Sequence, residues 1–386
     1  MKVVHICLCG PFTDGAGYQE NLLTKYHAKQ GNDVTIVASQ WEWNSKGVLQ
    51  LNAQTGTYTQ HGVKIVRLET YYGTINFRFR IFRGLYQTIS LEAPDVLFVH
   101  GCQFLDVYTI KKYLASHPEV RAYMDNHADF SNSATNKLSL ALHRTLWRHC
   151  AHALIGCVEK AYGVLPARVD FLKEVYKLPA EKCELLVMGA DDELVEKATS
   201  EANKADIRKK YSIAPGDFLI MTGGKIDAAK RQTIQLMEAV QCMTESNIRL
   251  IVFGSVSEDL KEEVSRLADG KKVQYIGWIE ANKAYDHFAA ADLVVFPGRH
   301  SVFWEQVAGL GVPMLCKYWK GTTHIDIGGN VKFLYKDSIE EIKCYISSLA
   351  FEGSNEYESM RSAATGLAKK AFSYKSIADK SLSTNI

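Results

Sequence analysis

Short apolar runs alternate with longer mixed segments along the whole chain. Runs of about four to eight apolar residues are typical of buried strands, and apolar residues that recur every three or four positions are typical of helices. The runs predict strands at residues 3–8, 34–38, 63–68, 95–99, 121–124, 153–158, 184–188, 218–222, 249–253, 273–276, 293–296 and 314–317. The periodic segments predict helices at residues 17–30, 138–151, 206–211, 260–267, 281–290, 302–310 and 357–382, and a further one that ends at residue 243. Residues 41–62 have no clear period, which indicates a loop or a hairpin.

This alternation predicts an α/β protein whose parallel sheets are covered by helices on both faces. A chain of 386 residues is long enough for two domains of ordinary size. We expect residues 1–188 to form the first domain and residues 189–367 the second. The last segment, residues 368–386, is expected to pack back onto the first domain.

Composition and charge narrow the class of protein. The formal net charge of +2 gives no reason to expect a nucleic-acid partner. The nine cysteines have neither zinc spacing nor a CxxC pair, as is typical of a reducing compartment. The apolar run at the N-terminus is too short for a signal peptide, and no run approaches the ~18–20 residues of a membrane span. We therefore expect a cytoplasmic protein.

A glycine-containing loop follows the first predicted strand. Gly15, Ala16 and Gly17 precede a helix, where bare backbone can approach a phosphate or a sugar. The dinucleotide-binding pattern is not met, because Glu20 takes the place of its third glycine and residues 38–40 include no acidic residue for a ribose. The loop therefore predicts an anion or sugar site without the NAD fingerprint.

Polar residues follow the strand predicted at residues 121–124. The carboxyl ends of parallel strands are where α/β folds place ligands. His127 is the strongest candidate for chemistry in the first half of the chain. The alternative is that His127 caps the helix that follows.

The stretch from Ala290 to Pro313 combines an apolar strand, a loop with Pro297 and Gly298, and a helix that begins near Val302. The first amide groups of a helix have no partner within it, so this position suits an anion. Glu305 lies one turn into the helix, where a carboxylate can accept neighbouring hydroxyls, as on a ribose. The alternative is a buried crossover in which Glu305 is merely solvated.

The second half of the chain resembles the retaining, family-4-type glycosyltransferases of the two-domain GT-B architecture. GGKIDAAKR is similar to the family's GRLxxxKG segment and carries Lys225 and Lys230, and RLIVFGS is similar to a strand that ends in a glycine facing the nucleotide. VQYIGWI, HFAAADLVVFPG and WEQVAGLGVP match three further segments, the last with Glu305 at the ribose-binding glutamate. The motifs occur in the family's order over nearly the whole chain.

The resemblance implies a fold and a set of site residues. The fold would be two Rossmann-like, doubly wound parallel-sheet domains that face each other across a cleft. The catalytic residues would be His127, Lys225 and Lys230. The donor-binding residues would be Gly15, Ala16, Gly17, Gly224, Gly254, Trp278, Ile279, His300, Ser301, Val302 and Glu305.

The implied reaction moves a sugar from a nucleoside-diphosphate sugar onto a glycan or lipid-linked glycan with retention of configuration. The departing phosphate would take the acceptor proton. We expect UDP rather than GDP as the nucleotide, no cofactor and no metal, because the chain has no D-x-D motif and Lys225 and Lys230 could supply the positive charge instead. Surface polysaccharide synthesis is the family's commonest setting.

The chain departs from the family pattern in one loop. The family has an earlier glutamate that contacts the donor sugar, and here Arg299, His300 and Ser301 occupy a shortened loop in its place. We expect His300 or Ser301 to take over sugar contacts, so the donor cannot be carried across. His324, in a later loop, is expected to have a structural role.

An aromatic stretch that includes Arg78, Arg80 and Arg83 suits a membrane surface or the anionic head of a lipid-linked acceptor. It predicts peripheral contact with the inner face of the membrane. The alternative is an amphipathic helix that packs on the sheet and keeps its arginines in water.

Two other functions fit the same architecture. A nucleotide-sugar epimerase would need acid and base residues around the sugar, and the sequence offers no convincing carboxylate pair. A nucleotide- or glycan-binding protein that has lost catalysis would explain the missing first glutamate.

Overall fold

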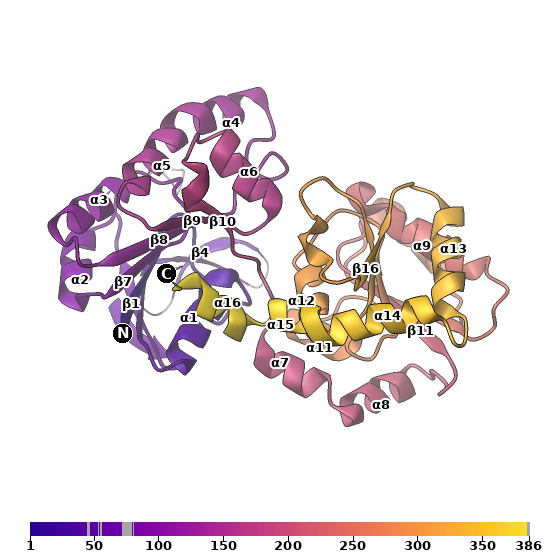
Figure 1. The fold of residues 1–386 in the computed structure, drawn as a ribbon. Coiled ribbons are helices and arrows are strands. Elements are labelled where there is room, and N and C mark those ends of the chain that lie inside the picture. Colours follow the sequence, from indigo (N-terminus) through magenta and orange to yellow (C-terminus); the bar gives the residue numbers. More distant parts are fainter. Residues whose placement is uncertain (45–46, 53, 55, 72–78, 80, 384–386) are drawn as a thin grey trace. The chain divides into compact units, whose positions relative to one another are not determined.

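A computed structural model describes residues 1–44, 47–52, 54, 56–71, 79 and 81–383 of the chain. The chain divides into two compact units (Figure 1). The first unit comprises Met1–Val187 together with Ala378–Ile386, and the second comprises Met188–Ile377. The first unit is thus built from two separate pieces of the chain.

The first unit contains an eight-stranded sheet in the order β10-β9-β8-β7-β1-β2-β6-β5. All of its neighbouring strands are parallel except β5 and β6. Its strands are β1 (Lys2–Cys7), β2 (Asp33–Ser39), β5 (Gly56–Gln60), β6 (Val63–Leu68), β7 (Val96–Val99), β8 (Arg121–Asn126), β9 (Lys160–Gly163) and β10 (Cys183–Leu185), and β3 (Trp41–Trp43) pairs separately with β4 (Leu49–Leu51). Its helices are α1 (Gln19–Lys29), α2 (Leu85–Glu92), α3 (Val107–Ser116), α4 (Lys137–Leu142), α5 (Arg148–Ile155) and α6 (Pro166–Glu174), with a π-helical turn at His143–Trp147 and the end of α16 (Tyr374–Ser381).

Alternation along the strands gives this sheet two different faces. Val4 and Ile6 on β1 belong to the apolar core that includes residues of α2, α3, α5 and α6. His5, between them, points to the opposite face, because successive side chains of a strand alternate. There its ring stacks on Phe98 of β7 at 5.4 Å between ring centroids. The second face therefore buries a histidine of β1 against an aromatic ring of β7, whereas the first face buries Val4 and Ile6 in the apolar core.

The second unit contains a six-stranded, fully parallel sheet in the order β13-β12-β11-β14-β15-β16. Its strands are β11 (Phe218–Gly223), β12 (Ile248–Phe253), β13 (Val273–Tyr275), β14 (Leu293–Phe296), β15 (Met314–Lys317) and β16 (Val331–Leu334). Its helices are α7 (Asp192–Ala198), α8 (Glu201–Lys210), α9 (Gln232–Gln241), α10 (Lys261–Leu267), α11 (Ala281–Phe288), α12 (Phe303–Leu310), α13 (Ile339–Ala350), α14 (Asn355–Ala363) and α15 (Lys369–Ala371). The strand order is that of a Rossmann fold, in which the winding reverses between the first and fourth strands.

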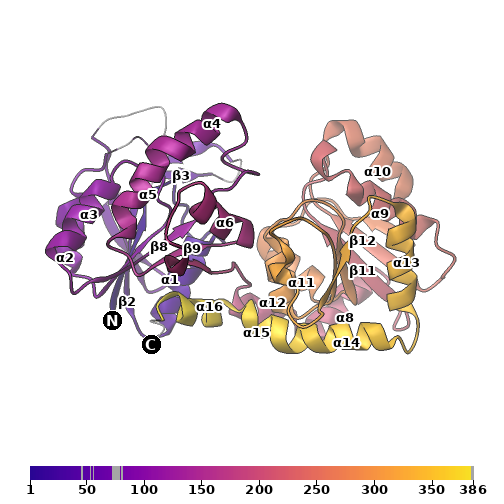
Figure 2. The ribbon, with the colours of Figure 1, turned by 45° about the horizontal axis from the view of Figure 1, so that its top comes forward.

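Helices cover both faces of the second sheet. In Figure 2, α9 and α13 lie on one side of β11 and β12, and α11 and α12 lie on the other. Strands buried on both faces are near-continuous apolar runs, as in Leu293-Val294-Val295-Phe296 of β14, all of which are buried. The predicted α/β class, with two Rossmann-like doubly wound sheets, is confirmed.

Several predicted elements have the observed bounds, and two predictions were wrong. The strands predicted at residues 63–68, 293–296 and 314–317 are β6, β14 and β15. Residues 153–158 are not a strand, because the apolar run there is the buried end of α5 and the turn after it. The single helix predicted at residues 357–382 is interrupted. It consists of α14, a π-helical turn at Ala364–Ala368, α15 and, after a break at Phe372 and Ser373, α16.

The arginine-rich stretch lies only partly within the described residues. Arg78 and Arg80 lie outside them. The guanidinium carbon of Arg83 lies 5.0 Å from the centroid of the Tyr71 ring, and Arg83 Nη1 lies 4.0 Å from a carboxylate oxygen of Glu69. No helix among the described residues is long and apolar enough to cross a membrane.

Backbone packing at the end of β12 makes a first testable prediction. Gly254 has φ of +130°, and a Cβ atom there would lie 1.8 Å from the carbonyl oxygen of Gly224. We expect Gly254→Ala to lower the free energy of unfolding by about 3 kcal/mol or more, because strain and overlap add. Urea unfolding of the purified variant measures this.

Gly270→Ala is the matched control. Gly270 also has a positive φ, +73°, but nothing lies within 4 Å of the added Cβ. This variant should lose only about 1 kcal/mol, the cost of the left-handed conformation. Equal losses in the two variants would show that the close contact with Gly224 is unimportant.

Candidate functional site

The second unit gathers three glycine-containing loops at the carboxyl ends of β11, β12 and β13. The backbone N–H of Gly224 donates to the carbonyl of Phe253 at 3.1 Å, and that of Gly254 donates to the carbonyl of Gly277 at 2.8 Å. The Tyr275 hydroxyl donates to the Gly254 carbonyl at 2.7 Å. The three loops are therefore joined by hydrogen bonds, with Gly224 and Gly254 at the centre of this loop cluster.

Lys230 lies where the winding of this sheet reverses, between β11 and β14. A Cβ atom on Gly298, after β14, would lie 3.6 Å from Lys230 Cγ, and one on Gly224, after β11, would lie 3.8 Å from Lys230 Nζ. Lys230 ends the 3-10 turn Ala228–Lys230, which is capped by Asp227, because Asp227 Oδ1 accepts from the Ala229 N–H at 3.0 Å. The side chain thus spans the position where open α/β sheets bind ligands.

The two candidate lysines differ in environment. Partial burial lowers the pKa of Lys230, although Asp227 opposes that shift. Lys225 is 65% exposed, and its Nζ forms an ion pair with Asp227 Oδ2 at 3.2 Å. A partly desolvated ammonium group binds an anion more strongly than a solvated one, so Lys230 is the better placed of the two.

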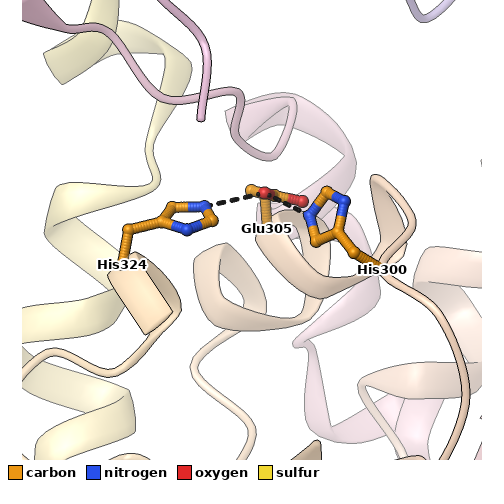
Figure 3. A group of neighbouring side chains, drawn as sticks. All are labelled: His300, Glu305 and His324. Carbon is orange, nitrogen blue, oxygen red and sulfur yellow. Dashed lines mark hydrogen bonds and ion pairs between the residues drawn. The ribbon is translucent and has the colours of Figure 1, made fainter. Parts of the chain in front are cut away.

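The start of α12 brings together His300, Glu305 and a residue from a later loop, His324 (Figure 3). Glu305 is fully buried, and its Oε1 accepts from His300 Nε2 at 2.8 Å and from His324 Nε2 at 2.9 Å. Oε2 of Glu305 is buried without a partner among the described residues. The sequence predicted that Glu305 can accept two neighbouring ribose hydroxyls and did not predict that two imidazoles already occupy one of its oxygens.

The two imidazoles determine the charge of Glu305. Burial would raise the pKa of this carboxyl, but His300 and His324 lower it to about 2. Glu305 is therefore a carboxylate at neutral pH. Because its folded pKa is depressed, the stability that this charge contributes is present above the pKa of the unfolded chain and is lost as the pH falls toward about 2.

The same three side chains are of kinds that bind a metal ion. One potential ligand atom from each of His300, Glu305 and His324 lies within 4.8 Å of the others. Both imidazole nitrogens lie at ordinary hydrogen-bond distance from one carboxylate oxygen, so two N–H donors already compensate its charge. Nothing in this geometry requires an ion.

The remaining donor-site candidates of the second unit lie around these loops. Trp278 is 69% exposed, and Ile279 beside it is half-buried. Ser301 and Val302 come directly before α12, whose start has no side-chain cap, although the Trp304 N–H already donates to the Ser301 carbonyl at 3.0 Å. The Trp319 indole donates to the Gly298 carbonyl at 3.3 Å, which ties the loop after β15 to the loop after β14.

In the first unit, Gly15, Ala16 and Gly17 lie in the turn between β1 and α1. Gly15 has φ of +66°. The adjacent Asp14 anchors this turn, because its Oδ1 accepts from the buried Arg67 at 2.6 Å and its Oδ2 accepts from Tyr58 at 2.6 Å. Sequence reasoning missed this anchor, which joins residues far apart in the chain.

His127 lies just after β8, and its side chain is 40% exposed. Its Nε2 lies 3.6 Å from Oδ2 of the buried Asp125. The same Oδ2 accepts from His100 Nδ1 at 2.6 Å. Burial opposes ionisation of Asp125, but His100 and His127 outweigh it and lower the pKa of Asp125. The structure thus places a buried carboxylate behind His127, which sequence reasoning did not identify.

Comparison with known proteins supports the fold. No protein-family model matches the chain, and no curated protein matches it. Among solved structures, HepE of Anabaena in complex with UDP is 16% identical, with 98% of each chain covered and a TM-score of 0.66. Sucrose-phosphate synthase of Thermosynechococcus elongatus is 14% identical, with 98% of this chain and 97% of its own covered and a TM-score of 0.62.

A third solved structure, with a similar TM-score and a similar sequence identity, is named for another activity. UDP-GlcNAc 2-epimerase of Neisseria meningitidis, bound to UDP-GlcNAc, is 13% identical, with 99% of each chain covered and a TM-score of 0.61. At such identities a likeness reports the fold and not the reaction. The chain therefore shares the fold of two Rossmann-like domains that GT-B glycosyltransferases and this epimerase have in common.

Proposed function

We propose that the protein is a glycosyltransferase that uses a nucleoside-diphosphate sugar. The observation that carries this proposal is the position of Lys230, a partly buried cation between the glycine loops that follow β11 and β14. Breaking a glycosidic bond to a diphosphate leaves negative charge on the phosphate oxygens. A fixed cation and free helix amides stabilise that charge as it develops.

Lys230 is proposed to bind the diphosphate, with Lys225 as a more exposed second cation. The amides near Ser301 and Val302, at the start of α12, would add to the positive potential. Gly224 and Gly254 have no side chain, so the nucleotide could approach the loops after β11 and β12 closely. Together these groups would provide the positive potential that the departing diphosphate needs, without a resident metal ion.

Glu305 is proposed to bind the ribose through Oε2. His300 and His324 hold Oε1, so the carboxylate stays charged and fixed in orientation. A ribose hydroxyl that donates to Oε2 would satisfy the buried oxygen that has no partner in the described residues. A small side-chain movement is needed, because this oxygen is buried in the structure.

The finer assignments come from the resemblance to the family. They are retention of configuration, UDP as the nucleotide, and a glycan or lipid-linked acceptor in polysaccharide synthesis at the inner face of the membrane. Gly15, Ala16, Gly17 and His127 of the first unit are proposed to contribute to the same reaction. For His127 we propose that it orients the sugar or the phosphate.

Ligand stabilisation and product analysis test the proposal together. We expect UDP to raise the melting temperature without added metal, whereas GDP, CMP and NAD do not, because a ligand at 100 times its Kd stabilises by about 2.7 kcal/mol. Radiolabelled UDP-sugars are then incubated with lysate glycans as acceptors, with and without EDTA. Transfer of label in the presence of EDTA is the expected result.

Other outcomes identify other functions. An isomeric UDP-sugar in place of a labelled glycan would indicate an epimerase. Binding of UDP without any product would indicate a binding protein that has lost catalysis. Stabilisation by NAD alone would contradict both the proposal and the interpretation of the glycine loop.

Replacement of Lys230 tests the diphosphate site. We expect Lys230→Ala to raise the Kd for UDP about 10-fold to 100-fold, because a hydrogen bond to a charged group contributes about 1.5–3 kcal/mol. Lys225→Ala should have a smaller effect, since its side chain is exposed and paired with Asp227. Isothermal titration measures both.

Lys209→Ala, on the exposed face of α8, is the control for loss of one positive charge. It should bind UDP like the unsubstituted protein. If Lys230→Ala also binds UDP normally while its melting temperature is unchanged, Lys230 is not in the diphosphate site.

Deoxynucleotides test the role of Glu305. With Oε1 held by two imidazoles, we expect one ribose hydroxyl to matter more than the other. Either 2′-deoxy-UDP or 3′-deoxy-UDP should therefore bind about 10-fold more weakly than UDP, while the other analogue stays within about threefold. Glu305→Gln should abolish the difference between the two analogues. Equal weakening of both analogues would mean that the carboxylate does not bind the ribose through one oxygen.

A further inference from the structure

Three buried histidines of the first unit form a continuous hydrogen-bonded chain. His100 Nδ1 lies 2.6 Å from Asp125 Oδ2, and His100 Nε2 lies 2.9 Å from His5 Nδ1. His5 Nε2 lies 3.0 Å from His27 Nδ1, and His27 Nε2 reaches α16. Asp125 and the three histidines are each at most 7% exposed. The chain therefore links the carboxylate behind His127 to the last helix.

The contacts at α16 indicate which ring nitrogen of His27 carries the hydrogen. Its Nε2 lies 2.9 Å from Ser381 Oγ and 3.2 Å from the carbonyl oxygen of Ala378, and Ser381 Oγ lies 2.9 Å from that same carbonyl. If Nε2 carries the hydrogen, it donates to this pair and Ser381 donates to the carbonyl. If Nε2 lacks it, Ser381 must turn to the ring, and the carbonyl then faces two lone pairs. The geometry favours a hydrogen on Nε2.

This hydrogen determines the direction of the next two bonds. Burial lowers the pKa of His27 to about 4, so a neutral His27 with a hydrogen on Nε2 must accept at Nδ1. His5 must then donate from Nε2. Burial, followed by the neighbouring His27 and His100, lowers the pKa of His5, so His5 is also neutral and accepts at Nδ1. His100 must therefore donate from Nε2.

The opposite end of the chain requires a second hydrogen on His100. Asp125 is buried and lies 2.6 Å from His100 Nδ1, and its other oxygen accepts from the backbone N–H of Gly101 at 2.9 Å. A carboxylate only accepts, so His100 Nδ1 must donate. His100 thus needs hydrogens on both ring nitrogens.

We propose that the hydrogen-bonded series His100–His5–His27 holds one proton more than three neutral imidazoles. This proton resides on His100 as the partner of the Asp125 carboxylate, and it fixes the tautomers of His5 and His27 as far as α16. The series of three histidines has an acceptor at each end, and each of its four hydrogen bonds needs one hydrogen. Three neutral rings carry only three ring hydrogens, so the fourth is the excess proton.

The electrostatic surroundings agree with this placement. Burial disfavours a charge on His100, but Asp125 and then Glu20 outweigh burial and raise the pKa of His100. The other titratable or charged groups on the elements around the three histidines are Lys2 and Cys7 on β1, Glu20, Lys25, Tyr26 and Lys29 on α1, Asp33 on β2, Arg121, Tyr123 and Asp125 on β8, His127 after it, Lys160 and Tyr162 on β9, and Tyr374, Lys375, Asp379 and Lys380 on α16. The buried carboxylate and the imidazolium together carry no net charge.

Loss of the excess proton would reverse the direction of the hydrogen bonds between the histidines and of the bond from His27 to α16. A neutral His100 keeps its hydrogen on Nδ1 for Asp125, so His5 and His27 would also have to donate from Nδ1. Ser381 would then turn from the Ala378 carbonyl to His27, which removes a hydrogen bond from the last turn of α16. The charge state next to His127 is in this way linked to the end of α16. Because the folded pKa of His100 is raised, its contribution to stability is present below the unfolded pKa and is lost as the pH rises through the folded value.

Tautomers can be observed directly, and the result does not depend on the proposed transferase activity. Protein labelled with ¹⁵N-histidine is studied at pH 7 by long-range ¹⁵N–¹H NMR, with assignments from single His→Asn variants. We expect both nitrogens of His100 to be protonated and His5 and His27 to carry their hydrogen on Nε2. A neutral His100 with Nδ1–H tautomers of His5 and His27 would overturn the proposal.

Two variants extend the test. Ser381→Ala should leave His27 as the Nε2–H tautomer, because the Ala378 carbonyl remains as acceptor; the control Ser383→Ala alters a hydroxyl on the same segment outside the chain. In Asp125→Asn the amide oxygen should accept from the Gly101 N–H, so that the NH2 group donates to His100 Nδ1. We therefore expect His100 to lose its Nδ1 hydrogen and become a neutral Nε2–H ring, while His5 and His27 keep their hydrogens on Nε2. If Asp125→Asn does not fold, the unsubstituted protein and Ser381→Ala still decide the question. A switch of His27 to Nδ1–H in Ser381→Ala would contradict the proposal.

Discussion

The reversal of winding within the parallel part of each sheet is the constraint on which the candidate sites depend. A strand next to a reversal point has connections that leave in opposite directions, so the loops at its carboxyl end separate and leave room for a ligand. In the second unit this point lies between β11 and β14, and Lys230 lies close to Gly224 and Gly298 in the loops that follow these strands. In the first unit it lies between β1 and β7, and His100 follows β7 there. The chemistry of both units is concentrated where backbone topology leaves space.

Both units also bury a carboxylate and compensate it with imidazoles. Glu305 accepts from two histidines through a single oxygen, and Asp125 accepts from His100 with a second histidine nearby. An isolated buried charge would be costly, so each carboxylate depends on its partners for its ionised form. A histidine partner can change its own charge near neutral pH, which a lysine or an arginine does not do. Each carboxylate is thus compensated by imidazole groups and not by a permanently charged side chain.

The sequence predicted the strands best where an apolar run is bounded by turn residues. The run at residues 293–296 ends at Pro297 and Gly298, and β14 ends there. The run at residues 153–158 has no such boundary, and a short apolar run cannot be told from a buried helix end by its period. The helix expected at residues 357–382 has a continuous period, yet Phe372 and Ser373 interrupt it, because the backbone of Ala190 bonds there to the carbonyl of Phe372. The sequence pattern could not predict contacts between side chains that lie far apart in the chain. His324 joins Glu305 from 19 residues away, and His5, His27 and His100 are joined only by the sheet and the helices on it.

The division of the first unit into two pieces of chain has a consequence for its synthesis. Residues 378–381 complete the surroundings of His27, and they are translated after the whole of the second unit. Until these residues leave the ribosome, His27 lacks the Ala378 carbonyl and the Ser381 hydroxyl as partners. The first unit to be translated is thus the last to be completed, and the second unit can fold while the first still awaits its final helix.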